Sequence, residues 1–292
     1  MIDSTLNKYS QIIKITDLID CYDLFLFDLW GVLINGQNSC YSGSVESVNN
    51  IIAQHKKLIF VSNSSRTSLS IYEKLKAFGV NLTNDMVITA GELTKNILFS
   101  PNKYFDIAQP IIYNFGRQVS QELWTGSNVK STEDINQANL MLIAFNAFAD
   151  EINDSSYDIL RQAASLKIPA ICPNNDRIVF LDDKIMYCPG HFAKKFEEFG
   201  GQVSYIGKPF KPIFQEALDR YPAIDKSRIL MVGDSLDTDI IGANNMQIHS
   251  ALVTTGNVEL QLLNQSTDSQ KLLHIRQICT NNNVYPNYIV SL

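Results

Sequence analysis

The stretch LFLFD, residues 24–28, is a short apolar run that ends in an acid. A continuous apolar run of this length is typical of a strand buried on both faces, as in a parallel sheet. A second run, LIFV at 58–61, ends in Ser62, and helical patterns follow the two runs at Ser44–Lys56 and Thr67–Phe78. The order strand, helix, strand, helix predicts an α/β fold built on a parallel sheet.

The same alternation returns towards the end of the chain. The predicted elements there are a strand, a helix and a strand: Arg228–Val232, Thr238–Asn245 and Ile248–Val253. Because ligands bind outside the carboxyl ends of parallel strands, we expect Asp28, Ser62 and Asp234 to face one site.

The middle of the chain, from about Thr89 to Tyr205, predicts a second α/β unit. Its predicted strands are Ile111–Asn114, Leu140–Phe145 and Pro169–Cys172. Its predicted helices are Gln118–Leu123 and Ser155–Leu166. We therefore expect residues 1–88 and 206–292 to form one domain and residues 89–205 to form a domain inserted into it. A helical pattern at Leu6–Asp20, and a closing helix and tail after about Ser266, complete the prediction.

Composition excludes several classes of function. The chain has 292 residues, a net charge of −6 and no basic block, so nucleic acid is not an expected partner. The longest apolar stretch, at 138–148, is too short to span a bilayer, and the first residues lack the pattern of a signal peptide. The five cysteines form no C-x-x-C pair, which is typical of free thiols in a reducing compartment. We expect a cytoplasmic protein.

Four short motifs occur in order: FDLWGVL at 27–33, FVSNSS at 60–65, IGKPF at 206–210 and VGDSLDTD at 232–239. This ordered set of Asp, Ser, Lys and Asp resembles the four motifs of the haloacid dehalogenase superfamily. The insertion, with TAGELT at 89–94 and CPNNDRIV at 172–179, resembles the capped sugar-phosphatase branch, class IIA. The resemblance covers nearly the whole chain after about residue 22. It implies a Rossmann-like, doubly wound parallel-sheet core with a smaller inserted α/β cap domain.

The resemblance implies a Mg²⁺-dependent phosphatase that acts on a small phosphorylated metabolite such as a sugar phosphate. Asp28 is the expected nucleophile, which would form an aspartyl-phosphate. The expected ligands of Mg²⁺ are Asp28, the main-chain carbonyl of Trp30 and Asp234, with Asp239 behind them or bound through water. Asp237 is a second candidate for that outer role. A capped helix start would also explain the acids at 234–239.

The other motifs are expected to contact phosphate. Lys208 would offset negative charge on the nucleophile and on the phosphoryl group. Ser62 and the main-chain N–H groups of Asn63 and Ser64 would hold phosphate oxygens near a helix start. An ordinary helix cap is the alternative for this serine-rich stretch.

The inserted domain is expected to set specificity for the leaving group. Asn175, Asp176 and Arg177 match the place where the cap loop of the family reaches towards the substrate. A plain surface arginine is the alternative for Arg177, and Glu92 is a weaker candidate at the junction of the two domains. Relatives with this cap type are often dimers, so a homodimer is an expectation by analogy.

One position departs from the pattern of the family. Phosphatases of the superfamily usually carry a second Asp two residues after the nucleophile, which acts as general acid and base, and here that residue is Trp30. Three readings follow: a weakened phosphatase that prefers good leaving groups, a catalytically silent protein that binds a phosphorylated metabolite, and a metal-independent dehalogenase-like hydrolase. The acidic motif at 232–239 argues against the last, because it suits a site that holds a metal.

Overall fold

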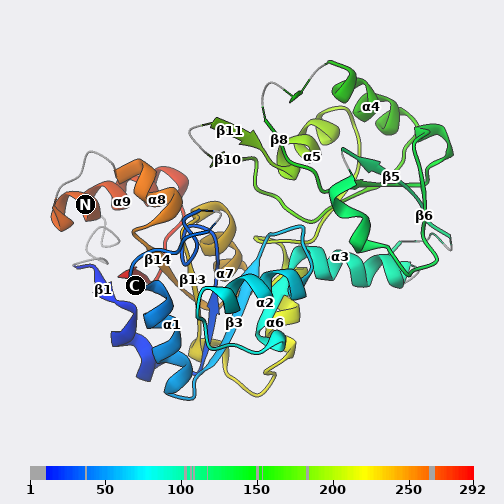
Figure 1. Ribbon diagram of the computed structural model, residues 1–292. Coiled ribbons are helices and arrows are strands. Elements are labelled where there is room, and N and C mark those ends of the chain that lie inside the picture. Colours follow the sequence, from blue (N-terminus) through cyan, green and yellow to red (C-terminus); the bar gives the residue numbers. More distant parts are fainter. Residues whose placement is uncertain are drawn as a thin grey trace. The chain divides into compact units, whose positions relative to one another are not determined.

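The structure is a computed structural model (Figure 1). It describes residues 11–292 except 37, 102–103, 106, 108, 117, 149–150, 153, 182–183 and 263–266. The chain divides into two compact units. Unit 1 contains the described residues up to Ser62 together with Tyr72–Val87 and Phe214–Leu292, and unit 2 contains Asn63–Ile71 and Ile88–Ile213.

Unit 1 is built on a parallel sheet. The strand order across the seven-stranded sheet is β1 (Ile13–Lys14), β15 (Tyr288–Ser291), β14 (His249–Val253), β13 (Ile229–Gly233), β2 (Leu24–Phe27), β3 (Lys57–Ser62) and β4 (Val87–Thr89). Every pairing described from β1 across to β3 is parallel. All four side chains of β2 are fully buried, as the apolar run predicts. The predicted α/β fold class is confirmed.

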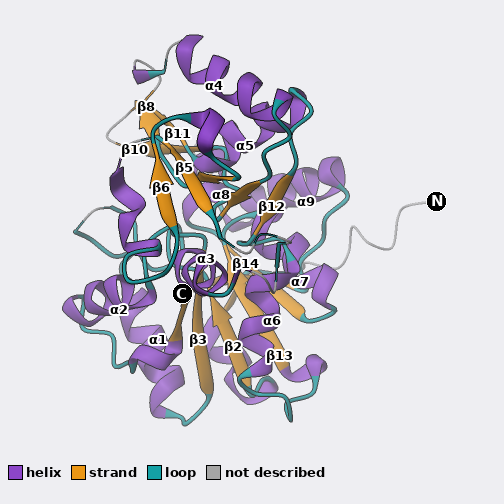
Figure 2. Ribbon diagram, turned by 90° about the vertical axis from the view of Figure 1, so that its right-hand side faces the viewer, coloured by secondary structure: helices purple, strands orange, loops and turns teal. Residues whose placement is uncertain are grey.

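The sheet reverses its direction of growth between β2 and β13. The chain adds β3 and β4 on one side of β2, and later adds β13, β14 and β15 on the other side. Figure 2 shows β3, β2 and β13 side by side. This is a doubly wound sheet, and the crevice outside the carboxyl ends of the two strands at the reversal is where such folds bind ligands.

Helices alternate with the strands of this sheet along the chain. Those that contribute to unit 1 are α1 (Ser44–Ala53), α2 (Ser68–Ala77), α6 (Lys211–Asp219), α7 (Ile241–Met246), α8 (Gly256–Leu262) and α9 (Asp268–Asn282). A π-helical turn, η9 (Leu236–Ile240), precedes α7, and 3-10 turns lie at η2 (Ile15–Cys21), η3 (Asn84–Met86) and η8 (Lys226–Arg228). Side chains of η9, β14, α8 and α9 share one apolar cluster, so burial against the sheet fixes the last two helices.

The N-terminal prediction is partly wrong. Of the helix predicted at Leu6–Asp20, residues 6–10 lie outside the described residues. The remainder is strand β1 followed by the 3-10 helix η2. The parallel pairing of Ile13 with Val290 explains the difference, because the segment forms backbone hydrogen bonds along the edge of β15 and therefore takes the extended conformation of a strand.

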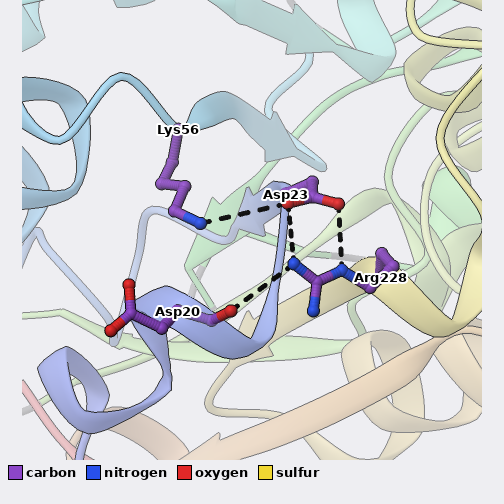
Figure 3. Close-up of polar contacts among 4 residues, drawn as sticks. All are labelled: Asp20, Asp23, Lys56 and Arg228. Carbon is purple, nitrogen blue, oxygen red and sulfur yellow. Dashed lines mark hydrogen bonds and ion pairs between the residues drawn. The ribbon is translucent and has the colours of Figure 1, made fainter.

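A bidentate ion pair joins the amino ends of β2 and β13 (Figure 3). Nε and Nη2 of Arg228 donate to the two carboxylate oxygens of Asp23 at 2.9 and 2.8 Å. Nζ of Lys56 lies 3.9 Å from the same carboxylate. This cluster is at the end of the sheet opposite to Asp28 and Asp234, so its role is structural.

Unit 2 contains two sheets. A parallel sheet has the order β12 (Val203–Tyr205), β9 (Ala170–Cys172), β7 (Leu140–Ile143), β5 (Ile111–Phe115) and β6 (Lys130–Thr132). An antiparallel sheet has the order β10 (Ile178–Leu181), β11 (Lys184–Tyr187) and β8 (Ala147–Phe148). The helices are α3 (Ala90–Phe99), α4 (Asp154–Ser165) and α5 (Pro189–Glu198), with 3-10 turns η5 (Gln118–Leu123) and η6 (Ile135–Gln137). Apolar clusters lie on the two faces of the parallel sheet.

No helix in the described part of the chain combines the length and the apolar character that crossing a membrane requires.

Candidate active site

Asp28 and Asp234 directly follow the two strands at the reversal of the sheet. Phe27 is in register with Val232, and the N–H of Asp28 donates to the carbonyl of Val232 at 2.9 Å, so the parallel pairing continues to the nucleophile candidate. One oxygen from each of Asp28, Asp234 and Asp239 lies within 4.8 Å of the other two. These carboxylates are 9%, 3% and 0% exposed. The structure thus brings together the three acids that the motifs predict as metal ligands.

Fixed hydrogen bonds orient the second and third acids. Oδ2 of Asp234 accepts from the N–H of Asn257 at 2.7 Å. Oδ2 of Asp239 accepts from the N–H of Ser235 at 3.1 Å. The π-helical turn η9 carries Asp239 back towards the end of β13, which is the kind of position where π-turns occur at functional sites. Charge-assisted bonds of this kind hold a carboxylate in one orientation.

Two glycines close around Asp234. Gly31 and Gly256 both have positive φ, of 84° and 64°. A Cβ built on either glycine would run into Oδ2 of Asp234. The hydroxyl of Thr255 donates to the carbonyl of Gly31 at 2.6 Å, which ties the loop after β14 to the loop after β2. Only glycine therefore allows these two loops to approach the carboxylate so closely.

The donor set of this cluster fits Mg²⁺. The three side chains offer only carboxylate oxygens, which are the ligands that hard cations such as Mg²⁺ prefer. Three buried like charges this close repel one another, and a divalent cation removes that repulsion. The main-chain carbonyl of Trp30 stays a predicted ligand, and the hydrogen bonds described for its loop are accepted by other carbonyls, those of Leu29, Gly31, Leu33 and Ile34. Asp237, the alternative outer ligand, is exposed and is not part of the cluster.

The side chain of Trp30 lies in solvent at 41% exposure. Nζ of Lys74, on α2, lies 4.5 Å from the centroid of its indole ring. An indole can neither give nor take a proton in general acid–base catalysis, so the position two residues after Asp28 has no such group.

Ser62 ends β3 and is buried, at 1% exposure. The next two residues belong to unit 2. Ser64 is tied to the start of α3, because its carbonyl accepts from the N–H of Gly91 at 2.9 Å. Its hydroxyl accepts from the N–H of Arg66 at 3.2 Å in a local turn before the first residue of α2, Ser68, so this bond is not the helix cap that the sequence offers as an alternative.

Asn63 uses its side chain to hold the lysine turn within unit 2. Its Oδ1 accepts from the N–H of Lys208 at 2.6 Å, and its Nδ2 donates to the carbonyl of the same residue at 3.1 Å. Lys208 itself is 1% exposed. The motif predicts only the main-chain N–H of Asn63 as functional, and the structure adds this second, positioning contact.

The loop at 174–177 is anchored to the start of α5. The N–H of Gly190 donates to the carbonyl of Asp176 at 3.1 Å, and the N–H of Cys188 donates to the carbonyl of Arg177 at 2.9 Å. Oδ1 of Asp176 accepts from Nδ2 of Asn63 at 3.4 Å. Asn175 and Asp176 are half-buried, whereas Arg177 is exposed.

Glu92 bonds the first residue of α2, Ser68, which belongs to unit 2 like Glu92 itself. Its Oε2 accepts from the N–H of Ser68 at 3.2 Å, at the first residue of α2. A carboxylate at a helix N-terminus is a structural arrangement, so this contact accounts for Glu92 without a substrate.

The cysteines next to this loop are unsuited to nucleophilic chemistry. Burial raises the pKa of the Cys188 thiol to about 12, and the nearby carboxylate of Asp176 adds to the rise. Burial also raises the pKa of Cys172. Both thiols stay protonated at neutral pH, and the thiolate is the reactive form.

Comparisons with known proteins agree with the four motifs. Residues 25–124 match the model of the haloacid dehalogenase-like hydrolases, and residues 205–275 match a second model of HAD-hydrolase-like proteins. The chain is 24% identical over 241 residues to an acid sugar phosphatase of Staphylococcus epidermidis, which covers 80% of this chain and 87% of that protein.

Solved structures share the fold. A possible sugar phosphatase of Cytophaga hutchinsonii superimposes with a TM-score of 0.78 at 24% identity, over 96% of this chain and 97% of that one. A glycerol phosphate phosphatase of Mycobacterium tuberculosis, solved in complex with magnesium, gives a TM-score of 0.65 at 20% identity, over 82% and 69% of the two chains. With its four motifs in order and three acids gathered at the reversal of the sheet, the chain belongs to the haloacid dehalogenase-like hydrolases.

Proposed function

We propose that this chain is a Mg²⁺-dependent phosphatase that hydrolyses a small phosphorylated metabolite through an aspartyl-phosphate on Asp28. The observation that carries the proposal is the group of three buried carboxylates from Asp28, Asp234 and Asp239 at the switch point of the sheet. Such a group suits a cation that also binds phosphate oxygens. The names of the similar proteins favour a sugar phosphate as the substrate class.

The chemistry has two displacements at phosphorus. A carboxylate oxygen of Asp28 attacks the phosphate ester, and the bond from phosphorus to the leaving oxygen breaks. Water then attacks the same phosphorus, which releases inorganic phosphate and restores the carboxylate. Bound Mg²⁺ would neutralise the charge that otherwise keeps a carboxylate and a phosphate apart.

The remaining roles stay predictions. Ser62 and the main-chain N–H groups of Asn63 and Ser64 are the proposed phosphate contacts, and Lys208 is the proposed source of positive charge. Residues 89–205 are the proposed specificity domain, with Asn175, Asp176 and Arg177 as its substrate-binding residues. The half-buried positions of Asn175 and Asp176, in a loop anchored to α5, support that assignment.

Trp30 keeps a second reading open, in which the protein binds a phosphorylated metabolite without turning it over. The exposed indole two residues after Asp28 favours this reading, because a general acid usually contributes about 10²–10⁴-fold to the rate. The dehalogenase-like reading fits less well. A metal-free site would leave the carboxylates of Asp28, Asp234 and Asp239 to repel one another.

The test is phosphate release from a panel of phosphorylated metabolites, with Mg²⁺ and with EDTA. We expect release that requires Mg²⁺ and that falls by about three orders of magnitude or more in Asp28→Asn. Asp158→Asn is the control, since this carboxylate is exposed on α4. Mg²⁺ binding by calorimetry gives a readout that does not depend on turnover, and Asp234→Asn should abolish it.

Two outcomes would contradict the phosphatase. Binding of Mg²⁺ and of a phosphorylated compound without release would favour the binding protein. Release of halide from halogenated acids in EDTA would favour the dehalogenase.

A further inference from the structure

An aromatic side chain and a lysine lie together in unit 1, and the aromatic residue, Trp30, comes two residues after the nucleophile candidate Asp28. Nζ of Lys74 lies 4.5 Å from the centroid of the Trp30 ring and 5.8 Å from that of Phe78. Trp30 is 41% exposed, whereas Trp124, the other tryptophan, is 8% exposed. Exposure alone would not distinguish Trp30, so the inference depends on its position in the chain and on the contact with Lys74.

The backbone that carries Trp30 is held on both sides. The N–H of Ile34 donates to the carbonyl of Leu29 at 2.8 Å, and the N–H of Gly31 donates to the carbonyl of Ile34 at 2.9 Å. These bonds form a tight loop directly after Asp28. The indole therefore starts from a fixed point two residues from the nucleophile, where the family usually places its general acid.

The ring contact keeps a positive charge at that point. A cation over the face of an indole ring is attracted electrostatically to the ring. The ring adds no opposite charge, so this contact does not neutralise the ammonium group. The field of Lys74 also reaches Cys40 in the loop after Asp28, where it acts to lower the pKa of a thiol that burial raises. Lys74 is thus a cation of the nucleophile loop, although it comes from α2.

We propose that Trp30 and Lys74 form the leaving-group end of the site and select acyl and aryl phosphates. The ammonium group of Lys74, positioned by the indole, offsets the negative charge on a leaving oxygen that departs without a proton. This inference rests on the proposed phosphatase function, and it replaces the sugar phosphates that the names of similar proteins favour with acyl and aryl phosphates as the preferred substrates.

The reaction balances without a general acid. Asp28 forms a bond to phosphorus, and the electron pair of the broken P–O bond stays on the leaving oxygen. A carboxylate or phenolate is stable in that form, whereas an alkoxide is not. In the second step both protons of the attacking water leave with inorganic phosphate, and the electron pair of the second broken P–O bond returns to Asp28. Alkyl phosphates are therefore expected to turn over slowly.

The test measures kcat/KM for a series of substituted phenyl phosphates, for acetyl phosphate and for glycerol phosphate, all with Mg²⁺. We expect kcat/KM of the unmodified protein to fall steeply as the leaving group becomes more basic. Lys74→Met should lower kcat/KM by about tenfold or more for aryl phosphates and should steepen that dependence. Lys74→Arg should keep most of the activity, because it restores the charge.

Lys76→Met is the matched control. Lys76 is on the same helix, and its Nζ lies 5.6 Å from the ring centroid of Tyr72, so the variant removes a similar pair. Trp30→Asp is the reciprocal test. It supplies the usual acid, and it should raise the turnover of glycerol phosphate and flatten the dependence on leaving-group basicity.

Two results would overturn the proposal. One is an equal loss for Lys74→Met and Lys76→Met. The other is a loss for Lys74→Met that is the same for every leaving group. Failure of the phosphatase function itself looks different, since the unmodified protein would then release no phosphate from any of these compounds.

Discussion

The side-chain amide of Asn63 holds both backbone groups of Lys208. The amide oxygen accepts from the N–H at 2.6 Å, and the amide nitrogen donates to the carbonyl at 3.1 Å. The same nitrogen lies 3.4 Å from a carboxylate oxygen of Asp176. A Cβ on Gly207 would run into this amide, so the turn closes tightly around it. One amide thus fixes the backbone of the lysine turn and also contacts the loop at 174–177.

Asn63→Asp should therefore impair catalysis strongly, although the two side chains are nearly the same size. The carboxylate keeps the acceptor but loses the donor, and it faces both the carbonyl of Lys208 and the carboxylate of Asp176. We expect kcat/KM for phosphate release to fall by about 100-fold, because small displacements of a charged group carry penalties of that order. Steady-state kinetics with the best substrate of the panel measures this.

Asn49→Asp is a matched control for that variant. The amide of Asn49 donates to the carbonyl of Gly79 at 2.9 Å and accepts from the N–H of Asn81 at 2.8 Å. It makes the same two kinds of bond in unit 1, outside the four motifs. It should lower the thermal midpoint without changing kcat/KM. If Asn63→Asp behaves in the same way, Asn63 has no positioning role.

Gly31→Ala should weaken Mg²⁺ binding. A methyl group there would run into Oδ2 of Asp234, and the positive φ adds strain. Gly79→Ala shares the strain, with φ of 86°, but nothing lies within 4 Å of its Cβ. Both variants should lose about 1 kcal/mol of stability from the backbone. Only Gly31→Ala should also raise the Kd for Mg²⁺, by at least tenfold, in calorimetry. Equal Mg²⁺ affinity in the two variants would show that the close approach of Gly31 to Asp234 is unimportant.

The sequence predicts the strands that are buried on both faces, and it misses those that depend on a partner. β2, β3 and β13 are continuous apolar runs, so their burial pattern identifies them. β15 is also apolar, at Tyr288–Ser291, but this segment is predicted as part of the tail that follows the closing helix. Pairing with β14 decides its state, and the side chain of Asn287 accepts from the N–H of Ser250 at 3.0 Å to hold that edge.

The parts of the site that the sequence predicts differ in the same way from those that it misses, because the missed parts depend on contacts between distant segments. Asp28 and Asp234 follow adjacent parallel strands, so topology alone brings them together. The contacts of Trp30 with Lys74, and of the Asn63 amide with Lys208, join segments distant in the sequence. No spacing rule predicts them, because they depend on how a helix or a turn packs on its neighbours.

Arg228→Met should destabilise the sheet and leave catalysis intact. The guanidinium of Arg228, hydrogen-bonded to Asp23, lowers the pKa of that carboxyl below its ordinary value of 3.8 (Figure 3). A lowered pKa means that the stabilisation is complete above pH 3.8 and is lost as the pH falls through the value in the folded protein. At pH 7 we expect Arg228→Met to have a slightly lower thermal midpoint than the unmodified protein. Below pH 3.8 this difference between the two proteins should become smaller.

Arg161→Met is the control for this ion pair. Arg161 bonds Asp158 at 2.6 Å, but both side chains are on the surface of α4. Exposed ion pairs between residues three positions apart on a helix contribute little to stability, so the thermal midpoint of Arg161→Met should hardly differ from that of the unmodified protein. A decrease for Arg228→Met that is equally large at pH 7 and in strong acid would show that lost packing, and not the ion pair, is responsible.

Tyr22→Phe should destabilise unit 1 in a manner that depends on alkaline pH. The buried hydroxyl of Tyr22 lies 2.6 Å from Nδ1 of His249 and 3.2 Å from the hydroxyl of Tyr288. Burial, and then the contact with Tyr288, raise the pKa of Tyr22 above its ordinary value of 10.0. The folded protein therefore holds this proton at a pH where the unfolded chain releases it. The stabilisation is complete below pH 10.0 and falls as the pH rises further.

The free energy of unfolding from urea titrations measures this effect. At pH 7 we expect Tyr22→Phe to lose about 1 kcal/mol, the usual value for a buried hydrogen bond. Above pH 10 the difference in free energy of unfolding between the variant and the unmodified protein should become smaller, because the variant has no phenol at this position to titrate. Tyr104→Phe is the control, since Tyr104 is 60% exposed and its hydroxyl is not buried. A gap that stays constant into alkaline pH would mean that the folded and unfolded states hold the proton of Tyr22 equally, and the hydroxyl would then stabilise the fold only through its neutral hydrogen bonds.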